Sequence, residues 1–215
     1  MEIYETEEQQ VEALKRWWQE NSTATLIGLG LGIVFIVGWN YWQDYRSSQA
    51  QQASALYAEL MKAMEANKKD SVEKLAEQIQ TKFTGSEYAL YSGLMLAKVK
   101  IQKDDLAGAQ QVLDKLATDS NKEISNIAKI RLVRILLAKK EYEQGLKLIN
   151  EIDPATSASF SGEYDELIGD LYVGLDRLDQ ARTSYQSALR NGQQSPLLQM
   201  KIDDLTPPEK LESKK

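Results

Sequence analysis

The sequence predicts an all-α protein in which a single transmembrane helix is followed by a solenoid of helical repeats. Two observations carry this prediction. No charged residue occurs between Glu20 and Asp44, and a helix needs about 20 apolar residues to cross the hydrocarbon core of a bilayer. Beyond this stretch, small and apolar residues recur at intervals of 36 residues, with helical spacing inside each interval and no alternating strand pattern.

The predicted transmembrane anchor comprises residues 21–43, and its centre reads ATLIGLGLGIVFIVGWNYW. A helix satisfies every backbone hydrogen bond of such an apolar stretch internally. Aromatic side chains stand near both ends, and rings with one polar edge favour the level of the lipid headgroups. We expect the membrane-interface aromatics to be Trp17, Trp18, Trp39, Tyr41 and Trp42.

A buried core helix and a cleavable signal peptide are the two alternative interpretations of this stretch. The rest of the chain has no all-round apolar partner for a core helix. A signal peptide opens with a basic region and closes with small residues, whereas this stretch follows an acidic segment of about twenty residues and ends on bulky aromatics. We therefore predict an uncleaved anchor.

The basic residues that flank the span predict its orientation. Lys15 and Arg16 directly precede it, whereas Arg46 and then Lys62 follow it. Because cytoplasmic flanks carry the excess of Lys and Arg, the N-terminus is predicted to be cytoplasmic. The large C-terminal part is then predicted to lie outside the cytoplasm.

Residues 1–20 are predicted to form a cytoplasmic amphipathic segment. Its apolar stripe at positions i, i+3 and i+7 comprises Val11, Leu14 and Trp18. Such a helix lies on the membrane surface or docks to a partner, and the simpler alternative is a short helix that leads into the span. We favour docking of this helix to a surface, either the membrane or a partner, because two adjacent tryptophans are costly to leave in water. Residues 21–23 are expected to supply a break or an N-cap.

Small residues inside the span form a candidate transmembrane helix contact. Ala24, Gly28 and Gly32 recur at a spacing of four, which lets another helix backbone approach closely. The motif is also frequent by chance in single spans. The sequence leaves open whether the partner is another copy or a different protein.

Composition excludes several kinds of chemistry. The 215 residues include no Cys and no His, so thiolate chemistry, zinc sites of the usual nitrogen and sulfur type and imidazole catalysis are excluded. The formal charge is −6, and the six Glu of residues 1–20 leave the remainder nearly neutral. That balance predicts no nucleic-acid partner. We expect no cofactor, no metal and no enzymatic activity, since the acidic pairs Asp104–Asp105 and Asp203–Asp204 fall near helix ends.

The residues after the span predict a helical hairpin followed by three repeat units. Residues 44–67 and 71–83 have helical apolar spacing and are joined by a short turn, so they are expected to pack antiparallel. The repeat interval of 36 is seen in two sets of mostly small residues, expected where paired helices touch most closely; Val133 is large for such a position. The first set is Ala97, Val133 and Gly169, and the second is Ala109, Gly145 and Ala181.

These units resemble the tetratricopeptide repeat. The last unit matches the small and large positions of that family through Ile168, Gly169, Tyr172, Ala181, Tyr185 and Ala188. The first two units are looser, and the interval exceeds the usual 34 residues, which loops such as residues 153–157 would absorb. A generic helical bundle is the alternative. We predict a tetratricopeptide-like repeat domain over residues 44–205 and a disordered tail over 206–215.

The predicted repeat domain ends in a closing helix. Ser195 is expected to cap it and Pro196 to occupy its first position. An apolar face is predicted for Leu197, Leu198, Met200, Ile202 and Leu205.

The resemblance to the tetratricopeptide repeat implies a groove lined by the first helix of each pair. The candidate partner or client groove consists of Tyr91, Leu94, Lys98, Ile127, Ile130, Arg134, Glu163, Glu166 and Asp170. This groove would grade from apolar and basic to acidic, and would suit an extended or helical peptide. The sequence leaves open whether a helix of the same chain fills it.

The whole chain resembles the YfgM family, the ancillary subunit of the bacterial SecYEG translocon. The opening MEIYETEEQQVEALKRWWQEN, the glycine-rich span that ends GWNYW and the degenerate repeats carry this resemblance. It implies a single-pass protein of the bacterial inner membrane with a periplasmic domain. The implied partners are the SecYEG translocon, a membrane-anchored periplasmic chaperone of the PpiD type and newly exported polypeptides. The alternative is a membrane-tethered regulator that sequesters a cytoplasmic signalling protein through residues 1–20.

Overall fold

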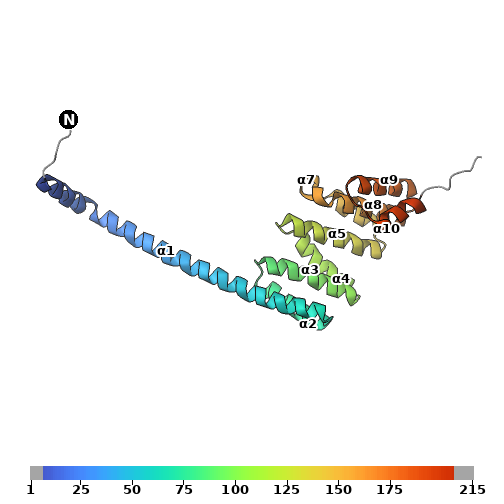
Figure 1. Cartoon of the computed structure of the whole chain (residues 1–215), viewed down its shortest axis with the longest axis horizontal. Helices are drawn as coiled ribbons and strands as arrows, with labels where there is room; N and C mark the ends of the chain where they lie inside the picture. Colours follow the sequence, from blue (N-terminus) through green and yellow to red (C-terminus); the bar gives the residue numbers. More distant parts are fainter. Residues whose placement is uncertain (1–6, 206–215) are drawn as a thin grey trace, which may run out of the picture. The chain divides into compact units, whose positions relative to one another are not determined.

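The computed structural model describes residues 7–205, and all regular secondary structure within this range is helical (Figure 1). The chain divides into two compact units between Gln52 and Ala53. Residues 1–6 of the predicted cytoplasmic segment and the predicted disordered tail, residues 206–215, lie outside the described range. The all-α prediction is confirmed for the described residues.

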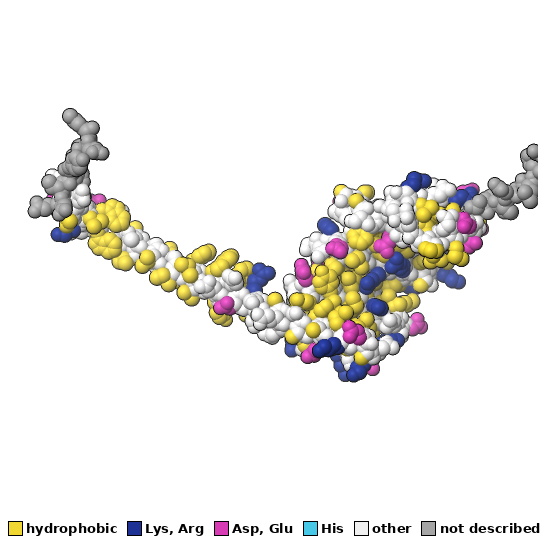
Figure 2. Space-filling view, in the orientation of Figure 1, with side chains coloured by type: hydrophobic (Ala, Val, Ile, Leu, Met, Phe, Trp, Pro, Cys, Tyr) yellow, Lys and Arg dark blue, Asp and Glu magenta, His cyan; other side chains and the backbone are white. Residues whose placement is uncertain are grey.

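Helix α1, Glu7–Glu65, begins in the first unit and continues into the second. Within the described residues it is the one helix long and apolar enough to cross a membrane. None of its most apolar stretch is buried, so this stretch is not the core helix of a soluble fold. Figure 2 shows hydrophobic side chains along this part of the helix.

The polar residues at the start of the span do not break the helix, contrary to the sequence prediction. Asn21 donates from Nδ2 to the backbone oxygen of Trp17 at 3.0 Å, and Thr25 donates from Oγ1 to the oxygen of Asn21 at 2.8 Å. Both side chains bond back to the preceding turn, a pattern that leaves the helix intact. Helix α1 therefore runs without interruption from the predicted cytoplasmic segment into the span.

The second unit consists of helical hairpins that follow one another in chain order, as predicted for a solenoid. The end of α1 pairs with α2, and the later helices pair as α3 with α4, α5 with α6 and α8 with α9. Their bounds are α2 Lys69–Lys82, α3 Glu87–Gln102, α4 Leu106–Ala117, α5 Lys122–Ala138, α6 Tyr142–Asn150, α7 Pro154–Ser157, α8 Ser161–Gly174, α9 Leu178–Arg190 and α10 Pro196–Asp204.

Each hairpin of the second unit turns through the same backbone motif. The residue in the left-handed conformation is Asn67, Asp104, Lys140 or Asp176, with φ between 51° and 63°. The following amide donates to a carbonyl five residues back, as from Asp105 to Lys100 at 2.9 Å, which is the Schellman arrangement that ends a helix. The last three of these residues lie 36 apart, so the turn has the period of the sequence repeat.

The first hairpin shares this turn, which sequence analysis did not recognise. Lys68 donates to the oxygen of Ala63 at 2.9 Å, as its counterparts do in the later hairpins. The end of α1 and α2 therefore form a fourth unit of the same kind within the described chain. Its spacing of 37 residues from Asn67 to Asp104 is the sequence signal that could have revealed it.

Small residues allow the paired helices to approach closely, as the sequence predicted. Ala97, Ala109 and Val133 are fully buried. A methyl group added to Gly169 would lie 2.2 Å from the ring of Tyr185, and one added to Gly145 would lie 2.7 Å from Leu171. These glycines are therefore required by packing and not by backbone conformation.

The connection between α6 and α8 is helical and not the loop that the sequence suggested. Asp153 caps the short helix α7 by accepting from the amide of Ala155 at 3.0 Å. Asn126 of α5 donates from Nδ2 to the oxygen of Thr156 at 3.0 Å and accepts from the hydroxyl of Tyr164 at 2.8 Å. Burial raises the pKa of the Tyr164 hydroxyl, which stays protonated and able to donate. This buried network fixes α7 and α8 against α5.

Helix α10 closes the described repeats as predicted, although with a narrower apolar face. Ser195 accepts from the amide of Leu198 at 3.0 Å, and Pro196 occupies the first turn. Leu198 and Ile202 are buried against Ala181, Tyr185 and Ala188 of α9. Leu197 and Met200, by contrast, are 58% and 61% exposed, because they lie on the side of α10 that faces away from α9.

Changing Gly169 to Ala should destabilise the repeat unit. Tyr185 is buried and its hydroxyl is bonded to Asp170 at 2.7 Å, so its ring has no room to move away from a new methyl group. Overpacking of this kind costs about 1–3 kcal/mol. Thermal unfolding of the full chain in detergent, followed by circular dichroism, should show a lower Tm. The matched change Gly85→Ala meets nothing within 4 Å and should leave Tm unchanged or raise it; an equal effect of both changes would contradict the packing argument.

Changing Lys140 to Gly should stabilise the second compact unit, through the turn between α5 and α6. Lys140 has a φ of 61°, a conformation that costs a residue with a side chain roughly 1 kcal/mol and costs glycine little. A gain of about 1 kcal/mol corresponds to an increase in Tm of roughly 2–4 °C for a domain of this size. The control is Lys139→Gly, where φ is −79° and glycine should lower Tm. A decrease in both variants would show that the turn is not strained.

Candidate functional site

A groove of about 470 Å³ lies between α3 and α5 in the second unit. Three cationic side chains line it, Lys98 from α3 and Arg131 and Arg134 from α5. Its apolar lining comprises Ile101, Leu106, Ile135 and Ala138. Figure 2 shows Lys and Arg side chains among hydrophobic ones on the visible face of this unit. The groove therefore combines positive charge with apolar walls.

The three cations have unequal surroundings. Arg131 is half-buried and donates from Nη1 to the backbone oxygen of Leu94 at 2.7 Å. Burial, and secondarily the charge of Arg134, lowers the pKa of the Arg131 guanidinium. Arg134 is exposed and lies 3.3 Å from a carboxylate oxygen of Glu163 on α8. Lys98 is exposed and makes no hydrogen bond or ion pair with the part of the chain that the structure describes.

The predicted groove residues at the apolar end separate into exposed and buried positions. Leu94 and Ile130 are only 4% and 3% exposed, so they belong to the core and are not available to a partner. Ile127 is half-buried against the same core. Tyr91 is exposed, and its ring centroid lies 6.3 Å from that of Tyr57 at the end of α1. Burial, and secondarily Tyr91, raises the pKa of the Tyr57 hydroxyl.

The predicted acidic end of the groove is occupied by the chain itself. Lys201 of α10 lies 2.9 Å from Glu166 and 2.6 Å from Asp170, both on α8. Gln193 donates a further hydrogen bond to Glu166 at 2.9 Å. Burial by itself would raise the pKa of the Glu166 carboxyl, but the hydrogen bonds from Lys201 and Gln193 outweigh burial and lower it. The groove is thus filled along α8 and open between α3 and α5.

Sequence analysis missed part of the open groove. Ile101, Arg131 and Ile135 line it but were not among the predicted positions. Ile101 lies three residues beyond the predicted Lys98, and Arg131 lies four residues beyond the predicted Ile127. Ile135 lies one further turn beyond Arg131, so continuing the helical spacing by one or two turns would have found all three.

The candidate residues of the first unit lie on the surface of α1. A methyl group added to Gly28 or Gly32 would meet nothing within 4 Å, so this strip has no partner within the described chain. The same spacing of three and four residues continues from Ala24, Gly28 and Gly32 through Phe35, Trp39 and Trp42. The rings of Phe35 and Trp39 are 6.1 Å apart, and those of Trp39 and Trp42 are 5.3 Å apart. One face of α1 thus carries small residues followed by an aromatic ladder.

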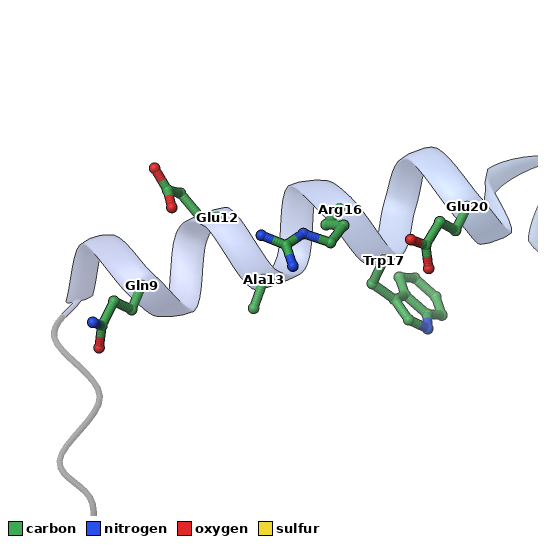
Figure 3. Close-up of a pocket in the computed structure, with 6 residues that line it drawn as sticks. All are labelled: Gln9, Glu12, Ala13, Arg16, Trp17 and Glu20. Carbon is green, nitrogen blue, oxygen red and sulfur yellow. The ribbon is translucent and has the colours of Figure 1, made fainter.

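The predicted interface aromatics are exposed on α1 in the first unit. Trp17, Trp18, Trp39, Tyr41 and Trp42 all have large exposed fractions. The guanidinium of Arg46 lies 4.9 Å from the ring centroid of Trp42, at the end of the ladder. Figure 3 shows the six residues that line a depression beside Trp17, and all of them come from the start of α1. A depression formed by one helix does not enclose a ligand.

Comparison with known proteins identifies the fold family. A family described as tetratricopeptide repeat-like domain matches residues 15–207. The chain belongs to this family. The solved structure of MamA residues 41 to the end from Desulfovibrio magneticus RS-1 is similar with a TM-score of 0.56 and 14% identity, covering 71% of this chain and 82% of that solved chain. That likeness supports the helical-repeat fold.

Relatives of nearly the same length share one description, "Ancillary SecYEG translocon subunit". The relative from Escherichia coli (strain K12) is 29% identical over 213 residues, covering 96% of this chain and 100% of the relative. The relative from Haemophilus influenzae is 27% identical over 202 residues, covering 93% and 97%. The relative from Neisseria gonorrhoeae is 27% identical over 206 residues with the same coverage. The resemblance to the YfgM family is therefore confirmed, and the relatives' description names no reaction.

The ion pairs of Lys201 should make the stability of the repeat unit depend on pH. Because folding lowers the pKa of Glu166, its contribution is complete above the unfolded value of about 4.3 and is lost as pH falls through the folded value. Glu166→Gln should cost about 1 kcal/mol at pH 7 and much less at pH 3. Tm measured at both pH values tests this.

A matched control for this prediction is Glu151→Gln. Glu151 is exposed and lies 3.9 Å from Lys147, so its removal should have little effect at either pH. Folding raises the pKa of Lys201, because the hydrogen bonds that its ammonium group donates to Asp170 and Glu166 outweigh burial, so this group stays charged throughout this range. A loss in Glu166→Gln that is equal at pH 7 and pH 3 would show that the pairing is not electrostatic.

Proposed function

We propose that this protein is a non-enzymatic ancillary subunit of the bacterial SecYEG translocon. It would scaffold a membrane-anchored periplasmic chaperone of the PpiD type and assist newly exported polypeptides. The observation that carries the proposal is the full-length similarity to the Escherichia coli relative of that description. The combination of one membrane-length helix with a tetratricopeptide repeat-like domain supports it.

The proposed location is the bacterial inner membrane, with the N-terminus in the cytoplasm and the repeat unit in the periplasm. Lys15 and Arg16 before the span support this orientation. The exposed aromatics Trp17, Trp39 and Trp42 suit the two headgroup regions. The lipid bilayer would supply the apolar surroundings that the described chain does not offer to the middle of α1.

Two surfaces of the protein would contact the translocon, the chaperone or an exported polypeptide. In the membrane, the strip of Ala24, Gly28 and Gly32 would allow close contact with a translocon or chaperone helix. Outside the membrane, the open groove between α3 and α5 would receive a partner or client segment. Leu94 and Ile130 are not part of this surface, because they are buried.

Crosslinking in intact membranes, followed by mild detergent extraction and mass spectrometry, should recover translocon subunits with this protein. Gly28→Leu combined with Gly32→Leu should reduce that recovery several-fold, because the larger side chains prevent close helix approach. The matched double change Gly30→Leu and Gly38→Leu leaves the strip intact and should not reduce it. Failure to recover any translocon subunit from wild-type membranes would contradict the proposal.

A second candidate function is a membrane-tethered regulator that captures a cytoplasmic protein through residues 1–20. It is favoured by one observation, the exposed apolar stripe of Val11, Leu14, Trp17 and Trp18. Deleting residues 2–14 would remove Val11 and Leu14 from this stripe and keep Lys15 and Arg16 for orientation. If this function is correct, the deletion should release a cytoplasmic partner without affecting recovery of the translocon.

A further inference from the structure

The open groove between α3 and α5 has an imbalance of charge. It presents three cations, Lys98, Arg131 and Arg134. Among the described residues, a single carboxylate, that of Glu163, forms an ion pair with this set, and its partner is Arg134. Glu163 lies against Arg134 and leaves the other two cations unneutralised. The contrast with α8 is direct, because there Lys201 pairs with two carboxylates.

Arg131 is the member of this set that most needs an anion. It is half-buried, lies near a second arginine, and its one hydrogen-bond acceptor within the described residues is the carbonyl oxygen of Leu94. A neutral carbonyl does not compensate the desolvation of a full positive charge, whereas a carboxylate does. Burial and the charge of Arg134 both lower the pKa of Arg131, which agrees with an uncompensated cation. A carboxylate ligand would relieve this cost and form charge-assisted hydrogen bonds.

The apolar residues beside the cations indicate what surrounds that carboxylate. On α3, Lys98 lies between Tyr91 and Ile101, and both flanking side chains are exposed. On α5, Arg131 and Arg134 lie between Ile127 and Ala138. Because α3 and α5 are the first helices of successive hairpins, they run in the same direction, and apolar surface borders the cations at both ends. From Tyr91 to Ile101 this surface extends about 15 Å along the helix.

We propose that the groove between α3 and α5 binds a polypeptide segment in which an Asp or Glu side chain is flanked on both sides by apolar side chains. The carboxylate would lie against Arg131 and Lys98, and the flanking apolar groups would cover Ile101 on one side and Tyr91 on the other. Apolar contact on both sides of the charge favours an internal acidic residue over a chain terminus. This inference deepens the proposed function and rests on it, since it names the chemistry of the segment that the repeat unit would hold.

Binding of two synthetic peptides to the full chain in detergent micelles tests the proposal. Both are acetylated, amidated and fluorescently labelled, and they differ only in a central Glu or Gln between Leu and Val residues. Fluorescence anisotropy should give a Kd about tenfold lower for the Glu peptide, which corresponds to ~1.4 kcal/mol. The preference should weaken as the salt concentration increases, because part of it is electrostatic.

Three variants test whether the preference for the Glu peptide over the Gln peptide arises in the groove. Lys98→Gln and Arg131→Met should each reduce the preference for Glu to less than threefold. Lys147→Gln is the matched control, because Lys147 lies on α6 outside the groove lining and its side chain is 80% exposed, and it should keep the full preference. Lys98 is exposed, so its variant remains informative if Arg131→Met affects folding.

Each other result would overturn the proposal. Equal affinity for the two peptides would show that the groove does not recognise a carboxylate. Binding that requires a free peptide C-terminus would show that the groove recognises the terminal carboxylate of a chain and not an internal acidic side chain. Binding of phosphatidylglycerol vesicles that is lost in Lys98→Gln would assign it to lipid. Absence of peptide binding would remove the inference and leave the translocon association standing, because the latter is measured separately by recovery from crosslinked membranes.

Discussion

The left-handed turn at the end of each first helix is the constraint on which the rest of the repeat unit depends. One residue with positive φ and one amide bonded five residues back end the helix and reverse the chain within four residues. Because the chain reverses direction there, the second helix packs antiparallel against the first. Because the same turn recurs in four described hairpins, successive hairpins present the same faces to one another. Their buried clusters are linked by the partly buried side chains of Val112, Leu148 and Tyr172, each of which packs against two neighbouring clusters.

Small residues set how closely these helices approach. Gly169 allows the ring of Tyr185 to lie close against α8, with its hydroxyl held by Asp170. Gly145 leaves space for Leu171 from the next hairpin. Close approach in one hairpin therefore fixes the position of the following one, and this regular stacking brings α3 beside α5 and α5 beside α8. The groove residues are neighbours because of this alignment.

The charged side chains at the two ends of the predicted groove are paired differently. Along α8, the terminal helix α10 supplies Lys201, which pairs with both Glu166 and Asp170 and occupies that part of the predicted groove. Between α3 and α5 the described chain supplies no equivalent anion for Arg131 and Lys98. The first unit differs again, since the apolar stretch of α1 has no protein partner among the described residues and requires a membrane or another protein around it. Both open surfaces are consistent with a protein that functions through its partners.

The sequence by itself determined the helical class, the membrane-length stretch and the repeat period of 36, because these depend on local composition and spacing. It also determined the cap at Ser195 and the small residues at Gly169 and Ala181, since capping and close packing restrict residue type at single positions. Only the tertiary structure decided which of the predicted groove residues are accessible. Leu94 and Ile130 have the same spacing as surface positions but are buried by adjacent helices, and Glu166 and Asp170 meet a lysine more than 30 residues away. Such contacts depend on how separate helices stack, and the spacing within one helix does not contain that information.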